Sequence, residues 1–230
     1  MIKHNTQGVI LRRTNYGEAD RIISFITSEF GKQSLIAKGV RKSKSKLAGG
    51  IEFFSVSDIS FIEGKHSLGT LISTRLIKHY HNIVKDIDRT MLGYEMLKQL
   101  DSSTEDRLGS EYFDLLRYLF AALDDPAIKL DLVREWFIMQ LLKLDGHTPN
   151  LLTDDQGINL IEETRYNFDI DTMTFQHSAL GKFSAKHIKL LRLGFGDNNP
   201  GSLQRITDID SLIVDILPLA QAMRDVYIRL

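Results

Sequence analysis

The spacing of apolar residues changes once along this 230-residue chain, and that change limits the folds it can adopt. Over roughly the first 80 residues, apolar side chains recur at close to every second position, which is typical of β-strands. From about residue 83 the period becomes that of α-helices. The sequence therefore predicts an α+β protein with two domains, a strand domain at 1–80 and a helical domain at 81–230.

The first domain is short for the number of strands it holds. Strands are expected at residues 7–15, 21–28, 33–40, 51–63 and 68–80. Five strands in about 80 residues, with no strong helix among them, suit a small closed barrel better than an open sheet with unprotected edges. The pair Gly49-Gly50 is expected to act as a hinge between the third and fourth strands.

The second domain repeats apolar residues at three and four positions. Helices are expected at 83–101, 110–125, 127–146, 184–194 and 207–230. An irregular insert is expected at about 148–181, where this period is lost. The domain is otherwise predicted to be all helical.

Charge is divided unevenly between the two halves. Residues 1–80 hold 13 lysines and arginines against six acidic residues, although the whole chain has a net charge of -1. Five cations directly follow the apolar run Leu35–Ala37 within nine positions, namely Lys38, Arg41, Lys42, Lys44 and Lys46. An exposed loop that binds a polyanion is one interpretation, and an ordinary solvated face is the other.

Catalytic patterns are weak in this sequence. No cysteine is present, which excludes disulfides, thiolate metal sites and a catalytic cysteine. His79 and His81 are expected to be a surface pair. No phosphate-binding glycine motif or nucleophile elbow occurs. We therefore expect no enzyme activity, no cofactor and no metal site. The N-terminus lacks a secretory pattern, so a cytoplasmic location is expected.

One segment of about 40 residues resembles a known family. It reads "GVILRRTNYGEADRIISFITSEFGKQSLIAKGVRKSKSKL" and includes Tyr16–Asp20, Thr27, Gly31-Lys32 and Ala37–Ser45. This order of motifs is similar to the opening of the RecO family of bacterial recombination mediators. The segment "LLKLDGHTPNL" resembles a later family motif, in which Leu-Gly-Tyr stands where this chain has Asp145-Gly146-His147.

The resemblance implies a fold and one departure from it. Family members have an N-terminal OB-fold barrel followed by a helical domain, in agreement with the change of period. Many also bind zinc through four cysteines. Thr153 and Gln156 stand here where the first two would be, so this chain is expected to lack the zinc site.

The resemblance also implies a function without covalent chemistry. Such proteins bind single- and double-stranded DNA, anneal complementary strands, and act with RecR to help RecA replace single-stranded DNA-binding protein during repair of DNA damage. These partners, and a place at the bacterial nucleoid, are the expectation here. The five loop cations would track phosphates. An OB-fold adaptor that docks proteins without binding DNA is the alternative, and a nuclease would need a carboxylate cluster.

Other residues are candidates for the same surface. Arg12, Arg13 and Arg75 lie on or near strands, where they line the DNA path or make local ion pairs. Phe53, Phe54 and Phe61 are candidates for base stacking, but at least one set is expected to face the core.

A partner site is expected in the helical domain. Arg134 and Lys143 flank an apolar helix and are candidates to bind the acidic tail of single-stranded DNA-binding protein. Trp136, Phe137 or Met139 would receive the apolar end of that tail. The alternative is that this helix is buried core with cationic ends.

Overall fold

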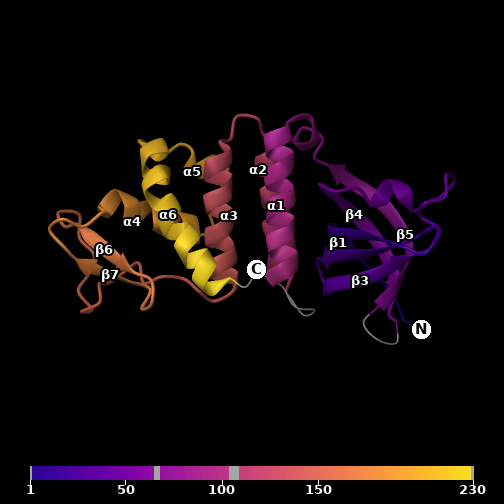
Figure 1. The fold of residues 1–230 in the computed structure, drawn as a ribbon, viewed down its shortest axis with the longest axis horizontal. Coiled ribbons are helices and arrows are strands. Elements are labelled where there is room, and N and C mark those ends of the chain that lie inside the picture. Colours follow the sequence, from indigo (N-terminus) through magenta and orange to yellow (C-terminus); the bar gives the residue numbers. More distant parts are fainter. Residues whose placement is uncertain (1, 65–67, 104–108, 229–230) are drawn as a thin grey trace. The chain divides into compact units, whose positions relative to one another are not determined.

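The structure is a computed structural model that describes residues 2–64, 68–103 and 109–228 (Figure 1). It holds the expected five strands, β1 (Lys3–Tyr16), β2 (Asp20–Thr27), β3 (Gly31–Ala37), β4 (Ser55–Ile62) and β5 (Leu68–His79). They are followed by helices, which confirms the predicted α+β class. The contacts divide the chain into two compact units, Met1–Pro126 and Ala127–Leu230.

The five strands close into a barrel in the order β1-β2-β3-β5-β4, with β4 pairing back onto β1. The first half of β1 pairs with β4 and the second half with β2, with an irregularity between Ile10 and Arg12. Such local irregularities bend a strand and increase its twist. The ring is completed where β3 and β5 run parallel. The expected OB-fold barrel is therefore present.

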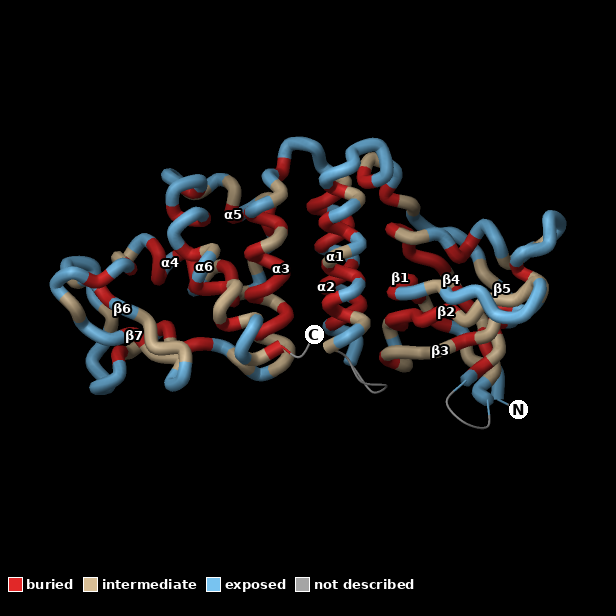
Figure 2. Tube along the Cα trace, in the orientation of Figure 1, coloured by how far each residue is buried: buried red, intermediate tan, exposed pale blue. Residues whose placement is uncertain are grey.

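The core of the barrel explains the period of two in the sequence. Ile23 and Phe25 on β2, Leu35 on β3 and Ile59 and Phe61 on β4 are all buried in one cluster. Successive side chains on a strand point to opposite faces, so alternate positions line this interior. Much of β2 and β4 is accordingly buried, whereas most of β5 is exposed (Figure 2).

Two helices belong to the same compact unit as the barrel. They are α1 (Ile87–Ser103), preceded by the 3-10 turn η2 (Ile83–Lys85), and α2 (Ser110–Asp124). Phe54 fills the space between them and the barrel, with its ring 5.0 Å from Tyr94 and 5.5 Å from Phe120. A Cβ at Gly93 would lie 2.5 Å from the Phe54 ring, so glycine is required there. The position 80/81 therefore marks the change from strands to helices, whereas the compact units divide at 126/127.

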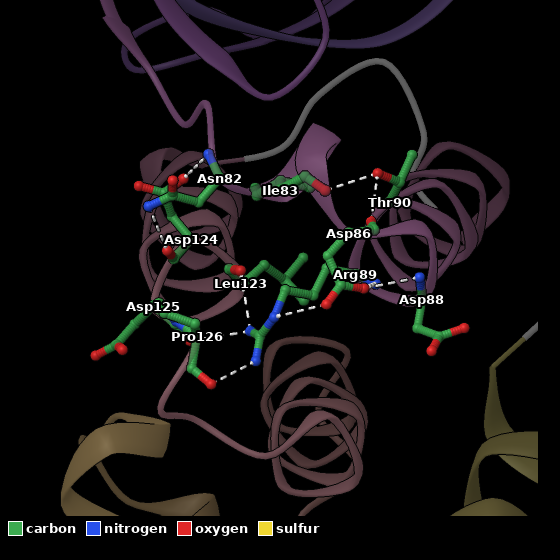
Figure 3. Close-up of polar contacts among 10 residues, drawn as sticks. All are labelled: Asn82, Ile83, Asp86, Asp88, Arg89, Thr90, Leu123, Asp124, Asp125 and Pro126. Carbon is green, nitrogen blue, oxygen red and sulfur yellow. Dashed lines mark hydrogen bonds and ion pairs between the residues drawn. The ribbon is translucent and has the colours of Figure 1, made fainter.

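A nearly buried arginine holds the ends of α1 and α2 together (Figure 3). The Arg89 guanidinium donates to the carbonyls of Leu123 at 3.0 Å, Asp125 at 2.9 Å and Pro126 at 3.0 Å. The last carbonyls of a helix have no donor within the helix. A cation at this end also interacts favourably with the negative end of the helix dipole. Arg89 therefore caps α2 from α1. Asp86 caps α1 in turn, by accepting two backbone N–H groups of its first turn.

The second unit packs three helices, a short helical turn and a small sheet. Its elements are α3 (Leu130–Leu144), β6 (Tyr166–Asp169), β7 (Thr174–His177), α4 (Ala185–Phe195), α5 (Pro200–Leu203) and α6 (Ile209–Tyr227). The strands β6 and β7 pair within the segment expected to be irregular, so this unit is not purely helical. The Asp154 carboxylate closes the turn between Thr153 and Ile158 by accepting the N–H groups of Gln156 and Ile158.

Across 2–64, 68–103 and 109–228, no three or more His, Cys, Asp or Glu side chains are grouped to hold a metal ion. In those ranges no helix combines the length and apolarity needed to cross a membrane.

The core of the second unit contains an acidic side chain. Glu135 on α3 has an exposed fraction of 0%, and neither carboxylate oxygen has a hydrogen-bond partner within the described part of the chain. Burial raises the pKa of Glu135 to about 8, against opposing contributions from Arg134 and Arg224. A carboxyl group that cannot be hydrated favours its neutral form. Glu135 therefore carries a proton at neutral pH.

This buried carboxyl makes stability depend on pH. The ordinary pKa is 4.5 and the folded value is about 8, so the folded state binds the extra proton between them. The contribution of Glu135 to the free energy of unfolding is fully present below pH 4.5 and is lost as pH rises through 8. Glu135→Gln should remove this loss, which is on the order of a few kcal/mol. Denaturant unfolding between pH 5 and 9 measures it.

The control is Glu163→Gln, which changes an exposed glutamate of the same unit. Its free energy of unfolding should follow the wild-type pH curve. Parallel curves for wild type and Glu135→Gln would show that Glu135 does not titrate as described.

Candidate nucleic-acid interface

The five clustered cations lie on the connection from β3 to β4. Lys38, Arg41, Lys42, Lys44 and Lys46 are all exposed, and this connection is largely pale blue in Figure 2. We call residues 38–50 the basic loop. Its apolar members turn inward, since Val40 is buried in the barrel core and Leu47 packs against that core.

The start of the basic loop is fixed to the turn between β1 and β2. Gly39 has φ +64°, a backbone conformation that residues with a Cβ rarely adopt. Its N–H donates to the Asp20 carboxylate at 2.7 Å, and the N–H of Arg41 donates to the carbonyl of Ala19 at 2.9 Å. These two hydrogen bonds hold the first loop cations beside the β1–β2 turn.

The end of the basic loop is fixed to β5. The Thr74 hydroxyl donates to the carbonyl of Leu47 at 3.1 Å. Gly50 is buried in the 3-10 turn η1 (Ala48–Gly50), and a Cβ there would lie 2.4 Å from the Thr74 side chain. Gly50 is therefore needed for close packing against β5, whereas a hinge at Gly49-Gly50 stays a prediction. The loop is anchored at both ends and projects its cations between them.

The loop cations differ from the arginines on the strands in how their charge is compensated. Within the described residues, none of the five loop cations forms an ion pair with a carboxylate. By contrast, Arg12 pairs with Asp101 at 3.1 Å. Uncompensated positive charge is therefore concentrated on the basic loop.

The other two strand arginines are paired in the same way. Arg13 donates to Glu52 at 3.3 Å and lies 4.3 Å from the centre of the Phe53 ring. Arg75 makes two hydrogen bonds to one oxygen of Asp58, at 3.1 and 2.5 Å. The interpretation as local ion pairs describes their geometry. A role of Arg12, Arg13 and Arg75 in contacting DNA stays a prediction.

Two of the three rings expected to stack on bases are buried. Phe54 and Phe61 are buried, so neither presents a face to a base, and that interpretation of them is wrong. Phe54 precedes β4 with φ +55° and faces the helices of its unit, which places it outside the strand alternation. Phe53 is half-buried, with the Arg13 guanidinium over its ring.

The proposed tail-binding helix, α3, is largely core. Trp136, Phe137 and Met139 are buried, so they do not form an open pocket. Lys143 donates to Asp197 at 2.9 Å, and this hydrogen bond lowers the pKa of Asp197. Arg134 is half-buried. The alternative of a buried helix with cationic ends describes α3, and partner binding by Arg134 and Lys143 stays a prediction.

Comparisons with known proteins agree with the geometry of the barrel. Residues 1–80 match the family model described as "Recombination protein O N terminal". The chain is 33% identical over 150 residues to "DNA repair protein RecO" of Syntrophus aciditrophicus, which covers 64% of this chain and 58% of that protein. It is 30% identical over 166 residues to the protein of the same name from Listeria monocytogenes, covering 72% and 63%.

Residues 1–80 therefore match the RecO N-terminal family, and the chain is similar to curated RecO proteins over about two thirds of its length. The aligned region spans about 60% of the length of these curated RecO relatives. Two segments that carry the RecO resemblance, Tyr16–Asp20 and Ala37–Ser45, are the two that meet in the structure, through the Asp20 carboxylate and the Gly39 N–H. Sequence reasoning missed Asp20, because no local signal links an acid to a glycine 19 positions later.

The role of Asp20 in holding the basic loop can be tested directly. Asp20→Ala should leave the Gly39 N–H without its acceptor and lower the free energy of unfolding by about 1–2 kcal/mol. Amide hydrogen exchange at Gly39 and Arg41 should become faster. Asp20→Asn keeps an acceptor oxygen and should show a smaller change.

Glu18→Ala is the matched control, because Glu18 is an exposed acid of the same turn. Its loop amides should exchange at the wild-type rate. Unchanged exchange at Gly39 in Asp20→Ala would contradict the anchoring role.

Proposed function

We propose that this chain is a RecO-family DNA repair and recombination mediator that binds single- and double-stranded DNA through the basic loop. The observation that carries the proposal is the set of five exposed cations on an anchored loop, none paired with a carboxylate within the described residues. The names of the curated relatives, "DNA repair protein RecO", support it.

The chemistry of such a loop suits the annealing of complementary strands. Each lysine or arginine that meets a phosphate releases a condensed counterion, and this gain is independent of base sequence. Neutralised strands repel one another less, while their base edges stay free to pair. No bond is made or broken in this step, so it needs neither a catalytic residue nor a cofactor.

The partners follow from the same proposal. A mediator of this family acts on DNA coated by single-stranded DNA-binding protein, contacts the acidic tail of that protein, and works with RecR so that RecA is loaded in its place. The basic loop supplies the DNA contact in this scheme. Nucleoid association in the bacterial cytoplasm would follow from DNA binding.

Salt dependence gives the first test of the proposal. If five loop cations neutralise five phosphates, log Kobs against log salt on single strands should have a slope of roughly -3.5, from about 0.7 per phosphate. Fluorescence anisotropy of a labelled oligonucleotide between about 50 and 500 mM salt, a tenfold range, measures this slope. A flat response would instead favour the protein-docking adaptor.

Removal of the loop charge gives the second test. The combined change of Arg41, Lys42, Lys44 and Lys46 to Ala should weaken binding to both DNA forms and make the salt slope shallower by roughly 2.8 on single strands. The free energy of unfolding should change by less than about 0.5 kcal/mol for each surface substitution. Anisotropy and thermal unfolding of the same samples measure both quantities.

The matched control removes four exposed lysines elsewhere, Lys85, Lys98, Lys182 and Lys189. It alters the net charge equally but leaves the basic loop intact. We expect DNA affinity close to wild type. Equal losses in the two variants would show that net charge, and not the basic loop, determines the affinity.

A further inference from the structure

Among the described residues, the aromatic rings of the barrel are buried or covered, with one exception beside the basic loop. Tyr16, the last residue of β1, has an exposed fraction of 52%. Within the described residues its ring packs against no other ring, and its hydroxyl has no hydrogen-bond partner. Within the described chain, no ring contact or hydrogen bond therefore engages this side chain.

Tyr16 is held next to the loop cations by the same hydrogen bonds that anchor the loop. It pairs in register with Asp20, whose carboxylate accepts the Gly39 N–H. The guanidinium of Arg41 lies 3.5 Å from the carbonyl of Gly17, the residue after Tyr16. The exposed Arg41 side chain therefore lies beside the residue that follows Tyr16, on two loops joined by hydrogen bonds.

This combination matches the chemistry of an unpaired nucleotide. Single-stranded DNA is bound by cations that track the phosphates together with aromatic rings on which the bases stack. The bases of a duplex already stack on each other, so the same ring has no free base to receive. On this turn the Glu18 side chain is exposed, whereas the Asp20 carboxylate accepts the Gly39 N–H.

We propose that Tyr16 is a stacking site for one unpaired base and that it gives the basic loop a preference for single strands. This inference rests on the proposed DNA binding and deepens it. The loop cations supply affinity for any phosphate backbone, and Tyr16 distinguishes a single strand from a duplex. Stacking needs the ring but not the hydroxyl, so phenylalanine replaces tyrosine without loss.

The test uses the full chain with Tyr16→Ala, Tyr16→Phe and Tyr118→Ala. Tyr118 on α2 is the matched control, since its exposed fraction is 56% and it lies outside the basic loop and the β1–β2 turn. Each variant is titrated with an oligothymidylate and with a blunt duplex of equal length. A single-stranded probe carrying 2-aminopurine reports stacking directly through quenching of its fluorescence.

Tyr16→Ala should weaken single-strand binding about five- to 150-fold, the change that corresponds to stacking of one base. Duplex affinity and the salt slope should stay at wild-type values, because no charge is removed. Quenching of 2-aminopurine should fall in Tyr16→Ala only. Tyr16→Phe and Tyr118→Ala should bind both DNA forms like wild type.

Two outcomes would overturn the stacking site alone. The first is that Tyr16→Ala binds single strands with wild-type affinity. The second is that it loses equal affinity for single strands and duplex, which would mean that the change acts through the fold of the loop. Thermal unfolding of Tyr16→Ala identifies a folding defect. If there is one, Tyr16→Leu, which keeps apolar bulk without a ring, must reproduce the loss of single-strand affinity. Wild type that binds neither DNA form would overturn the proposed function together with this inference.

Discussion

Closure of the barrel by β1 is the constraint on which the first unit and its basic loop depend. One strand of 14 residues pairs with β4 along its first half and with β2 along its second. This leaves the backbone groups of the barrel paired instead of exposed at a sheet edge. It also places the β1–β2 turn beside the C-terminal end of β3. Because both sides of that junction belong to one closed sheet, the basic loop is attached to a rigid support.

The sequence predicted the features that depend on residues close to one another along the chain. Alternation of apolar residues marked all five strands, and the cluster from Lys38 to Lys46 marked an exposed loop, because each signal lies within about ten neighbouring residues. The contacts that organise these elements join distant residues. Asp20 meets Gly39, and Arg12 meets Asp101 from α1. Neither pairing has a signature in the sequence near either partner.

The helical half shows the same limit in another form. Each strand of the β6–β7 pair has four residues, too few to display an alternation that distinguishes it from a loop. Helix α3 is apolar almost all round, which is the pattern of a buried helix and not of one with an open binding face. Glu135 interrupts that pattern, and the sequence alone does not say whether such an acid is paired, exposed or protonated.

Under the proposed function, the pairing of strand arginines with carboxylates has a consequence for how fast the protein would find DNA. With a net charge of -1, the chain as a whole exerts almost no attraction on a distant polyanion. The unpaired cations of the basic loop are felt only within about one Debye length, ~8–10 Å at physiological salt. Encounters are therefore governed by orientation at short range, not by long-range steering. Under the proposed function, the rate of association with DNA would therefore depend on which side of the protein meets it.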